Sequence, residues 1–252
     1  MCTLYNNTMI NKTSYLLFLL LLAVVFPAEL GAQNKKVKGN DQILSVTRET
    51  GDYDEVSLEG FMDVRLISGQ EGKLTVEGEE NLLEYIETEV QGDRLKIAVK
   101  RGVQLNPSAG KTIRITVPFS SLKAVQLTGS GDISSEKPII TDAFEVDLTG
   151  SGDIRLPLQT EQTSLALTGS GNITLTGSAN DFVCKLTGSG DVKAFDFKCQ
   201  SVRATLTGSG DIEVYASEEL KASVPGAGDI TYRGNPEKED FSTLGVGSIT
   251  KD

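Results

Sequence analysis

The sequence contains no histidine and no tryptophan among its 252 residues. Without histidine, the chain cannot form a Ser-His-Asp or Cys-His nucleophile system, and it lacks the imidazole ligands of the usual zinc sites. Without tryptophan, it lacks the commonest aromatic platform for stacking on sugar rings. These absences exclude the histidine-dependent hydrolases and most zinc enzymes.

Cysteine is also scarce, with three residues in the whole chain. One of them is Cys2, and only Cys184 and Cys199 lie in the body of the chain, so disulfides do not form the framework of the fold. The two cysteines fall at different positions of the repeat that fills this part of the chain. We therefore expect two small, buried thiols rather than a bridge.

Basic residues are outnumbered by acidic ones, 24 to 35, and the formal net charge is −11. Nucleic acids and anionic lipid surfaces are bound through Lys and Arg. The acidic balance therefore argues against DNA, RNA or an anionic bilayer as a partner.

The N-terminus has the features of a secretory signal peptide. Lys12 precedes an apolar run, Tyr15–Phe26, and the small residues after this run suit cleavage after Ala32. We therefore assign residues 1–32 to the signal. Gln33 occupies the position where a lipoprotein would have cysteine.

Beyond the signal, the chain contains no apolar stretch long enough for a transmembrane segment. The sequence therefore predicts an exported protein. Its expected location is the periplasm, an outer-membrane-associated site, the cell surface or the extracellular medium.

A heptapeptide, LTGSGDI, recurs through the second half of the chain. Three copies are intact, at Leu127–Ile133, Leu148–Ile154 and Leu206–Ile212. Two more carry one change each, at Leu167–Ile173 and Leu186–Val192. A looser copy lies at Val224–Ile230 and a remnant at Gly245–Ile249. Consecutive copies are 18 to 21 residues apart. Such a period indicates one structural unit per repeat, stacked on its neighbours.

Apolar residues alternate with polar ones on both sides of each copy, as in Phe144, Val146 and Leu148. This period of two is typical of strands with one buried face, and the Gly, Thr and Ser content excludes helices. The sequence therefore predicts an all-β fold, a parallel β-helix-like solenoid of about 20-residue coils. Its two sheets are joined by Gly-Ser-Gly turns, where glycine supplies a positive φ.

Equivalent residues of successive coils are expected to form ladders inside the solenoid. Two such inner columns are predicted: Leu148, Leu167, Leu186 and Leu206, and Ile154, Ile173, Val192 and Ile212.

An acidic or polar column occupies the position after each turn: Asp132, Asp153, Asn172, Asp191, Asp211, Asp229 and Ser248. Repeated Gly-Asp turns bind calcium in some β-rolls, so a metal ladder is one interpretation. However, Asn172 and Ser248 keep an oxygen while losing the charge, and no second acidic position recurs beside them. We favour side chains that accept hydrogen bonds from turn amides, and we assign no metal ligand.

The first half of the exported chain keeps traces of the repeat, such as LEGFMDV at Leu58–Val64. From Asp63 to Asp132 the chain runs 69 residues, about three and a half periods. Glu80–Val90 is compatible with a short helical turn before a strand, but we prefer a local insertion between coils. We therefore predict a flexible leader over 33–45 and a single solenoid domain over 46–252.

These motifs resemble the bacterial family named putative auto-transporter adhesin, head GIN domain. The resemblance rests on the iterated GSGD/N turns, on LEGFMDVRLISG with the adjoining LTVEGEENLLEYIETEV, and on ITVPFSSLKAVQLTGSGDI, and it covers roughly Val46 to Thr250. It implies a two-sheet, right-handed β-helical solenoid, adhesion at the cell surface and a Gram-negative, Bacteroides-like source. The family carries no catalytic residues to transfer.

Three functions remain open from the sequence. The first is a non-enzymatic binding protein of the cell envelope or surface, an adhesin, because a solenoid presents long polar faces. Its partner would be a host or self surface glycan or protein. The second is a periplasmic structural or regulatory scaffold, self-associated through the strand edges at a solenoid end as a homo-oligomer.

The third function is a carbohydrate-active enzyme, which would need paired carboxylates in a cleft. Acidic residues crowd one region, but such runs are usually solvated faces: Glu77, Glu79, Glu80, Glu84, Glu87 and Glu89. We therefore assign no catalytic residue and no cofactor, and favour the non-enzymatic functions.

Overall fold

The computed structural model describes residues 34–252, so the signal expected over 1–32 lies outside the described residues. Strands make up 70% of the structure and helix 2%. The elements in chain order are β1 (Lys35–Lys38), β2 (Ile43–Glu49), β3 (Glu55–Gly60), β4 (Asp63–Ser68), β5 (Lys73–Glu79), α2 (Glu80–Leu83), β6 (Ile86–Gln91), β7 (Arg94–Val99), β8 (Val103–Asn106), β9 (Arg114–Phe119), β10 (Ala124–Gly129), β11 (Asp132–Ser135), β12 (Ile139–Gly150), β13 (Asp153–Gly169), β14 (Asn172–Gly188), β15 (Asp191–Gly208), β16 (Ile212–Val224), β17 (Ile230–Gly234), β18 (Lys238–Thr243) and β19 (Ile249–Lys251).

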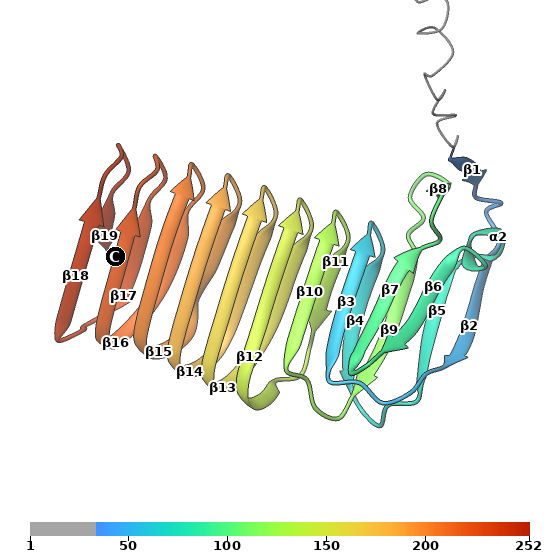
Figure 1. Ribbon diagram of the computed structural model, residues 1–252, viewed down its shortest axis with the longest axis horizontal. Coiled ribbons are helices and arrows are strands. Elements are labelled where there is room, and N and C mark those ends of the chain that lie inside the picture. The colour runs from blue at the N-terminus through green and yellow to red at the C-terminus, as the bar shows by residue number, and fades with distance from the viewer. Residues whose placement is uncertain (1–33) are drawn as a thin grey trace, which may run out of the picture. The chain divides into compact units, whose positions relative to one another are not determined.

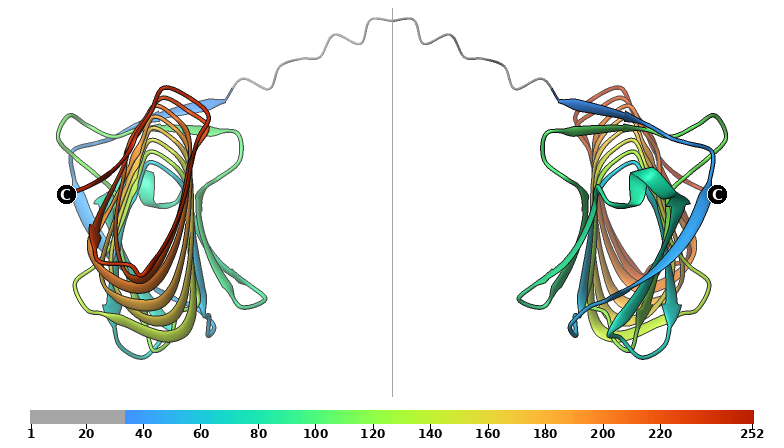
Figure 2. Two further views of the ribbon diagram at one scale, coloured as in Figure 1. Left: turned by 90° about the vertical axis from the view of Figure 1, so that its left-hand side faces the viewer. Right: turned by 90° about the vertical axis from the view of Figure 1, so that its right-hand side faces the viewer.

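The strands stack as a β-solenoid of about 7 turns, with coils about 19 residues apart (Figure 1). Each coil has two walls. The leading wall is formed by the strand segments that enter a turn, such as Glu145–Gly150, and the trailing wall by the segments that leave it, such as Asp153–Leu158. Seen along the axis, the coils superpose as a flattened loop (Figure 2).

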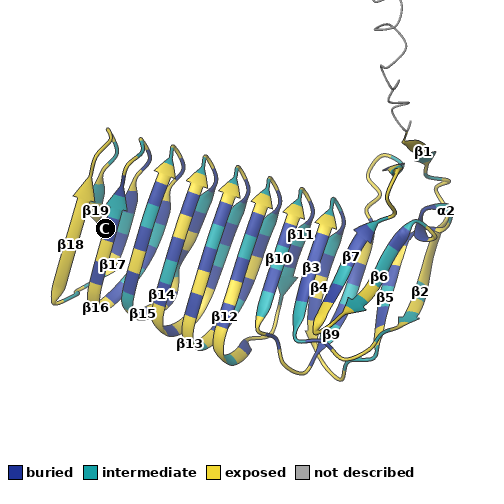
Figure 3. Ribbon diagram, in the orientation of Figure 1, coloured by how far each residue is buried: buried dark blue, intermediate teal, exposed yellow. Residues whose placement is uncertain are grey.

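The core lies between the walls, and buried residues alternate with more exposed ones along each strand (Figure 3). Leu148 pairs in register with Leu167, Leu167 with Leu186, and Leu186 with Leu206. All four are at most 1% exposed. The isoleucine and valine column keeps the same register, so both predicted inner columns are confirmed: Ile154, Ile173, Val192 and Ile212.

The order of the coils along the axis differs from the order of the chain. Asp63 pairs directly with Asp132, and Val64 with Ile133. The two aspartates are 69 positions apart in the sequence, but they lie in adjacent coils rather than three and a half coils apart. Instead, β3 and β4 pair with β10 and β11 on one side and with β7 and β9 on the other.

The segment between β4 and β10, together with β2, forms a cap at the N-terminal end of the stack. Here the pairing becomes antiparallel, between β2 and β5, β5 and β9, and β6 and β7. The single helical turn α2 buries Leu82 and Leu83, which are 0% and 4% exposed. Glu80–Val90 therefore combines the helical turn with strand β6, and the segment belongs to this cap rather than to an insertion between coils.

Arg48 ties the cap together. Its guanidinium donates hydrogen bonds to the carbonyl oxygens of Leu83 (2.7 Å) and Ile86 (2.6 Å) and to Oγ1 of Thr88 (3.2 Å). One side chain of β2 thus holds α2 and β6 in place.

We expected a flexible leader over 33–45, but its described part, residues 34–45, contains a paired strand. Lys35–Lys38 forms β1, which pairs in parallel with β8, and the amide of Lys35 donates to the carbonyl of Gly102 (2.8 Å). Its three lysines suggested a solvated tail, but Val37 packs against the core and the backbone completes a two-stranded sheet. The expected boundary at residue 46 falls inside β2.

The C-terminal end of the stack is built differently. Its last coil consists of β18 and β19, and every residue of β18 is exposed. Phe241, Leu244 and Val246 are 40%, 82% and 89% exposed. Within the described residues, no further strand pairs with the outer edges of these strands.

Candidate functional site

The turns between the walls form a ridge of stacked Gly-Ser-Gly corners, and the first glycine of the intact corners has a positive φ. At Gly188 φ is +133°, and an added Cβ would lie 2.1 Å from the carbonyl oxygen of Gly169 in the preceding coil. That same oxygen accepts hydrogen bonds from the amides of Ser189 (2.9 Å) and Gly190 (3.1 Å). The predicted conformational role of this glycine is therefore confirmed.

The second glycine of each corner is required by close packing. A Cβ on Gly190 would lie 2.0 Å from the carbonyl oxygen of Gly171, and one on Gly210 would lie 1.8 Å from that of Gly190. Successive backbones touch at these points, so no side chain fits between the coils.

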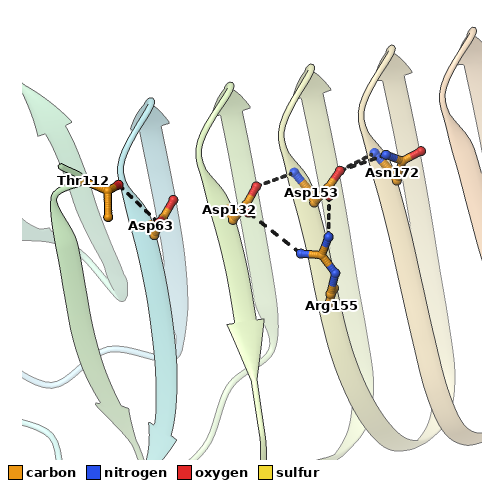
Figure 4. A network of polar contacts seen from close by, with 6 residues as sticks. All are labelled: Asp63, Thr112, Asp132, Asp153, Arg155 and Asn172. Carbon is orange, nitrogen blue, oxygen red and sulfur yellow. Dashed lines mark hydrogen bonds and ion pairs between the residues drawn. The ribbon is translucent and has the colours of Figure 1, made fainter. Parts of the chain in front are cut away.

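The column of aspartates accepts backbone hydrogen bonds, as the sequence predicted, but across coils rather than within one turn (Figure 4). Oδ1 of Asp132 accepts from the amide of Asp153 (3.1 Å), and Oδ1 of Asp153 accepts from the amide of Asn172 (3.2 Å). The Asn172 side-chain amide adds a second bond to Asp153 (2.9 Å). The same contact recurs from Asp191 to Asp211, from Asp211 to Asp229 and from Asp229 to Ser248.

Local donors offset the charge at two places along this column. The guanidinium of Arg155 lies against both Asp153 (2.5 Å) and Asp132 (3.8 Å). Hydrogen bonds from Ser248 lower the pKa of Asp229. At the other end of the column, burial and the neighbouring Asp132 carboxylate raise the pKa of Asp63.

The column has no second set of ligands that would make it a metal site. Throughout residues 34–252, no three acidic or sulfur-bearing side chains gather into a group suited to a metal ion. The geometry of the column therefore supports a structural role, in which each carboxylate joins one coil to the next.

The acidic region from Glu77 to Glu89 spreads over β5, α2 and β6 rather than converging on a cleft. Glu77 points outward, with its carboxylate 3.6 Å from the guanidinium of Arg114. Glu79 is 1% exposed and accepts hydrogen bonds from the amides of Asp41 (2.6 Å) and Ser108 (2.8 Å). This region therefore belongs to the cap and its surface.

The pKa of Glu79 reflects two opposing effects. Desolvation disfavours its charged form, but the hydrogen bonds from Ser108 and Asp41 and the charge of Lys111 outweigh desolvation. The pKa of this buried carboxyl is therefore lowered, and Glu79 is an ionised anchor for the loops around β1 and β8.

Cys184 and Cys199 are both free and buried, as the repeat positions predicted. Cys184 pairs in register with Ala204, whereas Cys199 pairs with Ala179, so the two thiols lie in different columns. Burial raises the pKa of both thiols, which makes them poor nucleophiles.

Two aromatic side chains in neighbouring coils of the second half, Phe195 and Tyr215, are half-buried at the surface. Phe197 and Tyr232 in the same region are buried. Lys198 Nζ lies 4.1 Å from the ring centroid of Tyr215, and the Arg233 guanidinium lies 4.0 Å from that of Phe195. Both surface rings are therefore covered by cations of the same chain, which leaves little ring face for stacking on a sugar.

The outer face of the leading wall contains a hollow of about 620 Å³ that sequence reasoning missed. We call it the leading-wall hollow, and it is lined by Lys123, Ala143, Phe144, Glu145, Gln162, Thr163, Ser164, Asp181, Val183 and Arg203. Its volume lies within the range of ordinary ligand pockets. The hollow is the best-formed candidate for a binding site in the described part of the chain.

A difference in side-chain length between neighbouring coils creates this hollow. Glu145, Ser164, Val183 and Arg203 occupy one outward column, each paired in register with the next. The short Ser164 and Val183 form the floor between the long Glu145 and Arg203. Aligning the repeats and comparing residue size down each outward column would have detected the site.

The described residues include no helix long and apolar enough to cross a bilayer.

Comparison with curated proteins gives no match. Solved structures do match. A protein from Bacteroides fragilis described as a putative adhesin has a TM-score of 0.81 at 21% identity, covering 86% of this chain and 100% of that one.

Two proteins from Parabacteroides are also similar. One from P. distasonis, described as a putative lipid binding protein, has a TM-score of 0.71 at 29% identity over 86% of this chain and 100% of its own. One from P. merdae, described as a putative adhesin, has a TM-score of 0.70 at 21% identity over 86% and 99%.

The family model described as "Putative auto-transporter adhesin, head GIN domain" matches residues 52–236. This range includes the cap from β3 onward, every stacked turn before the last coil, and the leading-wall hollow. Because the match extends over more than half of the sequence and agrees with the coil architecture, the chain belongs to the head GIN domain family.

Proposed function

We propose that this protein is an adhesin, a non-enzymatic binding protein exposed at the cell surface or in the envelope. The observation that carries the proposal is the long, rigid stack of about 7 coils, whose walls present side chains at regular intervals. Such a scaffold provides extended contact area rather than a reactive pocket. Its family, described as auto-transporter adhesins, supports this assignment.

Export accompanies this role. The signal peptide proposed over residues 1–32 would direct the chain out of the cytoplasm, and an adhesin must reach the outer surface to meet its partner. The partner would be a glycan or a protein on a host cell or on a neighbouring bacterial cell.

Two measurements together test the adhesin proposal. A membrane-impermeant label should modify the protein on intact cells, and the purified protein should bind saturably to an array of surface glycans and matrix proteins. Labelling only after the outer membrane is broken, together with no binding on the array, would overturn the proposal.

A second candidate function is a periplasmic scaffold assembled from several copies. It is favoured by the open C-terminal end, where β18 and β19 lack an outer partner strand among the described residues and Phe241, Leu244 and Val246 are exposed. Unpaired strand edges readily pair with another chain. Light scattering on the purified protein tests this function, since a monomer across micromolar concentrations would contradict it.

A lipid ligand is suggested by the P. distasonis protein, which is described as lipid binding. The net charge of −11 argues against an anionic bilayer. Flotation with zwitterionic and anionic vesicles tests this ligand beside the glycan array.

A further inference from the structure

The leading-wall hollow has features of a ligand site beyond its volume. It continues past Arg203 into a smaller hollow of about 170 Å³ that shares Asp181 and Val183 with it and ends at Lys221. The hollows therefore run along the solenoid axis, across strands rather than along one. Neighbouring strands are about 4.8 Å apart, so the column from Glu145 to Arg203 spans about 14 Å.

Three of the four charged side chains around this hollow lack partners among the described residues. The fourth, Lys123, is paired with Asp54. Within residues 34–252, the side chains of Glu145, Asp181 and Arg203 form no ion pair and no side-chain hydrogen bond. Their hydrogen-bonding capacity is therefore free for a ligand.

The position of the hollow discriminates between classes of ligand. It lies in the middle of the sheet, where the backbone groups of β12, β13, β14 and β15 are committed to the neighbouring coils. An extended peptide usually binds a sheet by pairing with a free edge, which this site does not provide. Recognition here must use side chains, so a ligand rich in hydroxyl groups fits better than a peptide.

The charge of the lining further restricts the classes of ligand that fit the hollow. Lys123 is already paired with Asp54, so Arg203 is the one unpaired cation of the lining and faces two carboxylates, those of Glu145 and Asp181. A strongly anionic polymer would therefore gain little from this site. Carboxylates accept hydrogen bonds from hydroxyl groups, and a guanidinium donates to hydroxyl and ring oxygens.

We propose that the leading-wall hollow binds a short stretch of a neutral glycan chain lying along the solenoid axis. Glu145 and Asp181 accept hydrogen bonds from its hydroxyl groups, Arg203 donates to its oxygens, and one sugar ring rests over Ser164 and Val183. This inference rests on the proposed adhesin function and gives it a binding face and a ligand class.

The test uses purified protein and a panel of neutral oligosaccharides, with uronic-acid oligosaccharides and an unstructured peptide pool beside them. Titration calorimetry should detect binding of neutral oligosaccharides. Asp181→Ala and Arg203→Ala should each weaken that binding about tenfold, because each removes a charged hydrogen-bonding group from the ligand.

Lys193→Ala and Glu213→Ala are matched controls. These residues pair in register on the trailing wall, outside the hollow, and form no ion pair among the described residues. Both control variants should bind like the unmodified protein. All four variants should keep the thermal transition, because the altered side chains lie at the surface.

Three results would overturn the inference: no binding of neutral oligosaccharides, preferential binding of uronic-acid oligosaccharides or peptides, or unchanged binding in Asp181→Ala and Arg203→Ala. Adhesion to cells that persists in these two variants would locate the adhesive surface elsewhere. The adhesin function would then stand without the hollow, so the two proposals fail independently.

Discussion

At the scale of the residue, two separate constraints require glycine at the corner positions. The first glycine combines a positive φ with a close approach to the coil before it, and the second is constrained by close approach alone. In both cases the atom that blocks a side chain is a backbone oxygen, which cannot move aside as a flexible side chain would.

Gly188→Ala should therefore lower the free energy of unfolding by more than about 2 kcal/mol. Its Cβ would lie 2.1 Å from the carbonyl oxygen of Gly169. Urea unfolding followed by circular dichroism provides the measurement.

Two controls separate the causes of this loss. Gly72 also has a positive φ (+102°), but no heavy atom lies within 4 Å of an added Cβ, so Gly72→Ala reports conformational strain without a contact between coils. Ser189→Ala should change stability by less than about 0.5 kcal/mol. Equal losses in Gly188→Ala and Gly72→Ala would show that the contact between coils is unimportant.

Glu79 predicts a pH dependence of stability. Its pKa in the folded protein lies below the ordinary glutamate value of 4.5, so the folded state binds fewer protons than the unfolded state near that pH. The stabilisation is present above the ordinary value and is lost as the pH falls through the lowered one. Thermal melts between neutral and acidic pH should show this loss.

Glu79→Gln should destabilise the protein by about 2 kcal/mol at neutral pH, since one acceptor oxygen becomes a donor facing donors. It should also flatten the acidic part of the pH profile. Glu77→Gln is the matched control, because Glu77 is exposed and its contact with Arg114 spans 3.6 Å. A profile with the same acidic slope in both variants would contradict the assignment.

At the scale of the element, the aspartate column joins coils edge to edge along the ridge. Each carboxylate satisfies an amide at the point where the next coil leaves its turn. Asn172 and Ser248 fit this column because their side chains donate hydrogen bonds to the carboxylates of Asp153 and Asp229 in the preceding coils.

Asp153→Ala should cost about 1 kcal/mol, since it removes the acceptor of the Asn172 side-chain amide and one of the two acceptors of the Asn172 backbone amide, the other being the carbonyl oxygen of Gly152. Asp153→Asn keeps an acceptor oxygen and should cost less. Calcium or EDTA should leave the thermal midpoint of the unmodified protein unchanged. A large rise of the thermal midpoint with calcium would contradict the structural role and support calcium binding by the aspartate column.

Local elements could be predicted from the sequence, whereas pairings between distant segments could not. LTGSGDI encodes its own turn, because glycine positions and alternating apolar residues act within one coil. The cap depends on Asp63 meeting Asp132, a choice of neighbour that no local pattern encodes. The leading-wall hollow depends on Ser164 and Val183 lying between longer residues of adjacent coils, so its signal is spread over distant positions.

At the scale of the whole molecule, the two ends of the solenoid are unequal. Antiparallel strands, α2 and the Arg48 hydrogen bonds close the N-terminal end. The C-terminal end finishes on exposed strands whose inward positions include polar residues such as Glu239 and Lys251, paired with Leu220 and Tyr232. A second copy that paired with this open end would have to accommodate these charges.

Native-state hydrogen exchange should reveal this inequality. Amides of β18 and β19 should exchange fastest, those of β13 to β15 slowest, and the cap should be intermediate, because coils that contact neighbours on both sides open least readily. Mass spectrometry of peptic fragments provides the readout. Uniform protection along the chain would indicate one all-or-none unit instead.

Because β3 and β4 lie beside β10 and β11, the number of coils in the second half can change without disturbing the cap. The cap is complete once residues up to β11 have assembled, and every later coil is laid down on the free side of the coil before it. Gain or loss of a repeat in the second half would therefore leave the cap intact and alter only the reach of the molecule, by about 4.8 Å for each coil. The fold is therefore closed at one end by the cap and open to added coils at the other.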